Sequence, residues 1–126
     1  MDVRVIVFVG SLFLSCVATG EEQHRRVEYS PIEYFKNYAL SACIARGYSS
    51  EEVVGDATAA ARGYLELGSH PIDAYPAAIA LAKEFLAKEY KSHLSNERLI
   101  LMKCIDFYHS EALDKLAQKL REEDWE

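Results

Sequence analysis

Positive charge is scarce in this sequence. Its 14 lysine and arginine residues face 20 aspartate and glutamate residues, so the net charge is −6. Nucleic acids and anionic membranes are bound through clusters of basic side chains. The composition therefore predicts neither nucleic acid nor a membrane as a partner, and it leaves an acidic enzyme or a protein that meets a basic partner. At 126 residues the chain has room for one domain.

Signatures of catalysis are also missing. The sequence has no GxSxG nucleophile elbow, no glycine-rich phosphate loop and no HExxH zinc motif. No histidine is joined by a second metal ligand at helical spacing inside a predicted helix, and the two loop histidines, His70 and His93, are expected to be solvated. We predict no metal, no cofactor and no enzymatic activity. The four histidines are His24, His70, His93 and His109.

The beginning of the chain differs in composition from the rest. Residues 3–14 are nearly all apolar, and small residues follow, with Ala18 and Gly20 at the −3 and −1 positions of a cut after Gly20. The run is too short to span a membrane, so we predict a cleaved signal peptide over residues 1–20. A core helix or strand is the alternative, and lipidation of Cys16 is disfavoured because large residues precede it.

Cysteines are few, and export would change their role. Cys16 would leave with the signal peptide, so that Cys43 and Cys104 remain in the mature domain, residues 21–126. An oxidising compartment favours a disulfide between them, which would stabilise the fold by about 4 kcal/mol in the chain-entropy model. Two free buried cysteines are the alternative. A thiol enzyme using His109 as a base is disfavoured, because both cysteines fall on apolar helix faces where a thiol is inert.

Strand patterning is missing as well. No segment alternates apolar and polar residues for more than a few positions, whereas apolar residues recur at helical spacing. We predict an all-α fold, a compact bundle of about five helices with one disulfide. The predicted helices cover residues 31–47, 50–67, 73–90, 99–110 and 110–120.

Local signals bound the first two helices. Ser30 and Glu33 fit a capping box at the start of the first helix, and Gly47 is expected to end it in the left-handed conformation. Ser49 and Glu52 fit a second capping box.

The helix over 99–110 is apolar around most of its circumference. Only Lys103, Asp106 and Ser110 form a narrow polar stripe. Such a helix is buried by neighbours on several sides. We predict that it is the central helix, with Cys104 facing inward.

Small residues recur every four positions at Gly55, Ala59 and Gly63. Such spacing allows another helix to approach closely. A tight crossing within the molecule is favoured about two to one, and a contact with a partner or a second copy is the alternative.

With no chemistry predicted, binding is the remaining function. The segment 91–97 is polar, carries one apolar residue and joins two strongly predicted helices, which is typical of a loop that enters a partner's cleft. An ordinary connector is the alternative for the segment. The predicted partner-binding residues are Lys91, Ser92, His93, Leu94, Ser95, Asn96 and Glu97.

Four blocks of sequence resemble a known family. They are YFKNYALSACIARGY (34–48), AARGYLELG (60–68), AKEFLAKEY (82–90) and LMKCIDFYHS (101–110). In order and spacing they resemble the type VI secretion amidase immunity proteins that oppose the fourth amidase effector family.

The resemblance implies a periplasmic, all-helical homodimer that protects against a toxin. It implies inhibition of a secreted peptidoglycan amidase, an NlpC/P60-type cysteine peptidase, by a loop between the third and fourth helices. That loop maps onto 91–97, and a helix of the second subunit, 110–120, would add contacts. The alternative function is a small periplasmic chaperone, stapled by the same disulfide.

Overall fold

The protein is built from α-helices alone over the residues described here. The computed structural model describes residues 27–91 and 96–122, with side chains up to residue 119. The predicted signal peptide and residues 92–95 lie outside this description. The predicted all-α fold is confirmed by the helices α1 (Pro31–Gly47), α2 (Glu51–Leu67), α3 (Ala74–Leu86), α4 (Ile100–Tyr108) and α5 (Glu111–Glu122).

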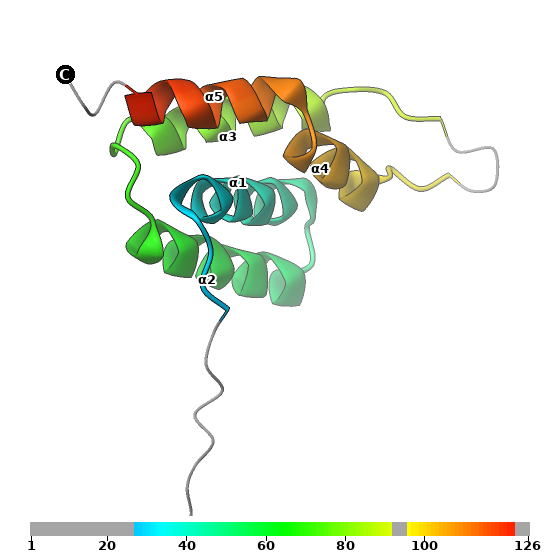
Figure 1. Cartoon of the computed structure of the whole chain (residues 1–126). Coiled ribbons are helices and arrows are strands. Elements are labelled where there is room, and N and C mark those ends of the chain that lie inside the picture. The colour runs from blue at the N-terminus through cyan, green and yellow to red at the C-terminus, as the bar shows by residue number, and fades with distance from the viewer. Residues whose placement is uncertain (1–26, 92–95, 123–126) are drawn as a thin grey trace, which may run out of the picture.

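Helix α1 occupies the centre of the bundle (Figure 1). It packs against all four other helices: α2 lies on one side, α3 and α5 lie together on the other, and α4 closes one end. An ion pair of 2.6 Å between Lys36 and Asp114 adds a polar link from α1 to α5. The prediction that the helix over 99–110 is central is therefore wrong.

Helix α4 has only nine residues and packs against α1 and α3. Its outer face is apolar yet exposed, with Leu101 at 50%, Met102 at 51% and Ile105 at 44% of full exposure. The lysine of the predicted polar stripe is instead buried, because the Lys103 ammonium donates to the Leu86 carbonyl, 3.3 Å away. A tertiary hydrogen bond thus places one residue of the predicted polar stripe in the interior, while Asp106 of the same stripe is exposed.

The core joins α1 to the other helices through small and aromatic side chains. The predicted disulfide is confirmed: Cys43 on α1 and Cys104 on α4 are both fully buried and are bonded to each other. The largest fully buried side chains are Phe35, Phe107, Leu113, Cys43 and Cys104.

The capping prediction is confirmed for α1 and wrong for α2. The Ser30 hydroxyl accepts from the Glu33 N–H, and the Glu33 carboxylate accepts from the Ser30 N–H at 2.8 Å. Helix α2 begins one residue later than the second box requires, so that Ser50 is its N-cap and Glu52 does not reach the third helical position. The Ser50 side chain makes no capping bond.

Gly47 ends α1 for a different reason from the predicted one. No glycine of the described residues has a positive φ, and the cap residue is Tyr48 in an extended conformation. A Cβ atom at Gly47 would overlap the Ile100 side chain and lie 2.9 Å from Leu86 Cδ2. Glycine is needed here because α3 and α4 approach the end of α1 closely.

Helix α3 is shorter than predicted and ends at Leu86 rather than near Tyr90. Two side-chain contacts are made at this end of the helix. The Leu86 carbonyl accepts a hydrogen bond from the Lys103 ammonium on α4, and the Lys88 ammonium lies 3.6 Å from the centre of the Phe85 ring. After Leu86 the chain leaves the helix and runs out toward the segment that follows (Figure 1).

The prediction of a tight internal crossing at the small residues of α2 is wrong. A Cβ atom placed on Gly55 or Gly63 would meet nothing within 4 Å. Contact with a partner stays a prediction for this stripe. Within the described residues, no helix is long and apolar enough to cross a bilayer.

Candidate partner-binding surface

The predicted contact segment connects α3 to α4. Its described residues, Lys91, Asn96 and Glu97, are all exposed. The chain on both sides of the gap runs outward from the helices, at the end of the bundle closed by α4 (Figure 1). Ser92, His93, Leu94 and Ser95 lie outside the described residues.

A hydrogen bond to α4 holds the chain that enters this segment. The Tyr90 hydroxyl donates to the Asp106 carboxylate over 2.6 Å. This bond to an anionic acceptor is the main reason that the pKa of Tyr90 is raised above its usual value. The Lys103 ammonium lies 5.8 Å from the centre of the Tyr90 ring and adds a cation–π contact.

The chain that leaves the segment is held by α1. The Arg98 guanidinium donates to the Gly47 carbonyl over 3.3 Å, which satisfies an acceptor at the C-terminal end of that helix. Leu99 follows in the left-handed conformation, with φ of 55°, and is the N-cap of α4. This conformation costs a leucine about 1–2 kcal/mol, and it turns the chain sharply into the helix.

The exposed face of α4 forms a groove next to these anchors. The groove has a volume of about 770 Å³. Sequence reasoning missed this surface, because it assigned the same apolar residues to the core. Its lining residues are Tyr48, Glu97, Arg98, Leu99, Ile100, Leu101, Met102, Ile105 and Asp106.

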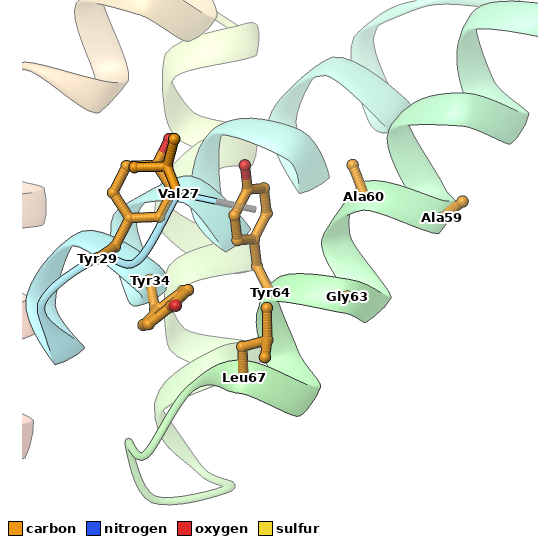
Figure 2. Close-up of a pocket in the computed structure, with 8 residues that line it drawn as sticks. All are labelled: Val27, Tyr29, Tyr34, Ala59, Ala60, Gly63, Tyr64 and Leu67. Atoms are coloured by element: carbon orange, nitrogen blue, oxygen red, sulfur yellow. The ribbon is translucent and has the colours of Figure 1, made fainter. Parts of the chain in front are cut away.

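A second groove, of about 320 Å³, lies where the first described residues pass over α2 (Figure 2). Tyr29, Tyr34 and Tyr64 line it and contact one another, with the Tyr29 and Tyr34 ring centres 5.6 Å apart. Gly63 leaves its floor open, as Figure 2 shows. The contacts among the three rings make this a packing surface.

The two described cysteines and His70 make structural contacts. Both described cysteines are in the disulfide. His70 is buried rather than solvated as predicted, because its ring stacks on Phe35 and its Nε2 donates to the Ala117 carbonyl over 2.9 Å. Residues 27–91 and 96–122 contain no group of three acidic, histidine or cysteine residues that could hold a metal.

Comparison with known proteins identifies the family of this chain. Residues 33–117 match the model of the family Tai4, the amidase immunity proteins of the type VI secretion system. No curated protein matches the chain.

Two solved structures share the fold. A chain in the structure of the effector–immunity system Tae4/Tai4 from Salmonella typhimurium is 37% identical, with a TM-score of 0.69 over 72% of this chain and 89% of that one. A chain in the complex of Tae4 from Salmonella typhimurium with Tai4 from Enterobacter cloacae is 21% identical, with a TM-score of 0.65 over 74% of this chain and 99% of that one. With most of its helical domain matched, this chain belongs to the Tai4 family of type VI secretion amidase immunity proteins.

Proposed function

We propose that this protein binds a type VI secreted peptidoglycan amidase and inhibits it by inserting residues 91–97 into the active-site cleft. The observation that carries the proposal is membership of the immunity family across residues 33–117, together with 37% identity to a chain of a solved effector–immunity system. Inhibition by occlusion needs complementary shape and slow release, and no catalytic group.

The exposure of Lys91, Asn96 and Glu97 supports the choice of this segment. The two anchors at its base, Tyr90 to Asp106 and Arg98 to Gly47, support it further. A contact segment held by a rigid scaffold loses less conformational entropy on binding than a free one. The net charge of −6 would also speed the encounter with a basic toxin.

The proposed site of action is the periplasm. The disulfide supports this location, because such bonds persist in oxidising compartments. Residues 1–20 would direct export and then be removed. The proposed assembly is a homodimer, in which the helix corresponding to α5 of the second subunit adds contacts to the amidase.

Inhibition of muropeptide cleavage tests this function. The chain is expressed with its first 20 residues, purified from the periplasm and titrated into the cognate amidase. We expect cleavage to stop near one immunity chain per amidase. Unchanged cleavage at a large excess of the protein would contradict the proposal, and protection of unrelated unfolded proteins would favour the chaperone instead.

The variant His93→Asp with Leu94→Asp tests the segment itself. We expect at least a tenfold loss of affinity at unchanged thermal stability, because two charges enter the proposed contact. The matched control is Leu67→Asp with Ser69→Asp, which places the same charges on exposed residues at the C-terminal end of α2. Equal inhibition by the segment variant and this control would remove residues 91–97 from the mechanism.

A further inference from the structure

The two described ends of the contact segment are tied to different helices. Tyr90 is bonded to Asp106 on α4, and Arg98 is bonded to Gly47 at the end of α1. Helices α1 and α4 are themselves joined covalently by Cys43 and Cys104. The segment therefore begins and ends on one rigid unit.

We propose that the hydrogen bond from Tyr90 to Asp106 is a positioning clamp. It fixes where the chain leaves the bundle, and it thereby presents the contact segment, residues 91–97, to the amidase. This inference rests on the function proposed above and names residues outside the segment. Neither Tyr90 nor Asp106 contributes to the core: Asp106 is exposed and Tyr90 is half-buried. A hydrogen bond between two such residues adds little to the stability of the core. We therefore assign it a role in positioning the chain rather than in holding the fold together.

The surroundings of the bond favour a single geometry. The Lys103 ammonium sits between the two anchored parts, since it donates to the Leu86 carbonyl on α3 and faces the Tyr90 ring. Residues 87–90 are thus fixed at both ends, by α3 at Leu86 and by α4 at Asp106. Without the Tyr90 hydroxyl bond, the attachment at Leu86 and the weaker cation–π contact between Lys103 and the Tyr90 ring would remain on this side of the segment.

Loss of the clamp would lower the fraction of molecules with the segment in its binding position. Apparent affinity falls in proportion to that fraction. Because the contacts within the complex are unchanged, we expect the loss to appear as slower association with an unchanged dissociation rate. The expected decrease in affinity is about threefold to tenfold. This range corresponds to the entropy cost of ordering one additional mobile side chain on binding.

The test measures association and dissociation rates of the full chain, purified from the periplasm, with the cognate amidase. Tyr90→Phe removes the donor and is expected to slow association. Tyr108→Phe, at the half-buried C-terminal end of α4, is the matched control and is expected to bind like the natural chain. Faster dissociation of Tyr90→Phe, with normal association, would show that the hydroxyl touches the amidase directly and would overturn the clamp.

Substitutions at Asp106 separate the hydrogen bond from the charge. Asp106→Asn and Asp106→Ala both remove the negative charge, but asparagine keeps an oxygen that can accept from Tyr90. We expect Asp106→Asn to associate nearly normally and Asp106→Ala to match Tyr90→Phe, with no further loss in the double variant Tyr90→Phe with Asp106→Ala. Equal defects in the Asn and Ala variants would assign the effect to charge and contradict the proposal.

Titration of Tyr90 gives a readout that does not depend on the amidase. The bond raises the pKa of Tyr90, so its contribution is complete below about pH 10, the usual value, and is lost as the pH rises through the raised value. In NMR titrations of the tyrosine Cζ signals, assigned with Tyr90→Phe, we expect Asp106→Ala to lower this pKa. An ordinary Tyr90 titration in the natural chain would overturn the clamp.

The results also distinguish this inference from the proposed function. If His93→Asp with Leu94→Asp weakens binding while Tyr90→Phe leaves association unchanged, the segment acts without the clamp and the inference is wrong. If the segment variant binds normally, the insertion mechanism itself fails.

Discussion

Helices α1 and α4 lie against each other and are bonded covalently, yet they are stabilised in different ways. Helix α1 has 17 residues and begins with a capping box that its own first turn supplies. Helix α4 has nine residues, starts from a left-handed leucine and has no side-chain cap at its N-terminus. Its position depends instead on contacts made with residues far away in the sequence.

Those distant contacts are few and can be named. Cys104 bonds to Cys43, Lys103 donates to the Leu86 carbonyl, and Asp106 accepts from Tyr90. The comparison teaches that α1 can be specified locally, whereas α4 and the contact segment next to it depend on the assembled bundle.

Removal of the disulfide should produce the largest difference between the two helices. We expect the variant Cys43→Ala with Cys104→Ala to lose about 4 kcal/mol of unfolding free energy, since the bond closes a loop between residues 61 positions apart. Urea denaturation measures the total loss of unfolding free energy. The reduced natural chain is the control, because it lacks the disulfide but keeps both sulfur atoms in the core. Amide exchange should increase more in α4 than in α1; an equal increase in both would contradict the comparison.

A methyl group at Gly47 should disturb the junction between the helices. We expect Gly47→Ala to destabilise the fold by about 1–3 kcal/mol, because its Cβ would overlap Ile100 and crowd Leu86. The matched control is Gly55→Ala on α2, where the Cβ meets nothing within 4 Å. This control should stabilise the protein by up to about 1 kcal/mol through helix propensity. A stabilising effect at both glycines in thermal melts would refute the close approach.

Loss of the α1 capping box should have the smallest effect. We expect Ser30→Ala to lower stability by about 1 kcal/mol, since its hydroxyl satisfies the Glu33 N–H. Ser50→Ala at the start of α2 is the control and should cost less, because that side chain makes no capping bond. Chemical denaturation of the two variants measures the difference, and equal losses would mean that α1 is not specified by its own first turn.

Most of the fold is predictable because its signals are local. Helical periodicity and the Ser30 cap identify α1, and the two cysteines outside the predicted signal peptide leave a single possible disulfide. The family resemblance, carried by four blocks of sequence, also leads to the correct family.

Apart from the capping box of α2, the errors concern contacts between distant residues. Burial of Lys103 depends on the Leu86 carbonyl, 17 positions earlier, and cannot be read from an apolar stripe. The close approach at Gly47 and the open space at Gly55 and Gly63 also depend on where other helices lie. For the same reason the pairing of Tyr90 with Asp106, 16 positions apart, was not predicted.

The bond between Cys43 and Cys104 makes part of the chain a closed ring, and the contact segment is inside that ring. A protease that cuts the backbone once between 91 and 97 opens the ring without releasing either piece. The C-terminal piece, with α4 and α5, stays covalently attached to α1. A nicked molecule therefore retains its assembled scaffold until a reductant separates the halves.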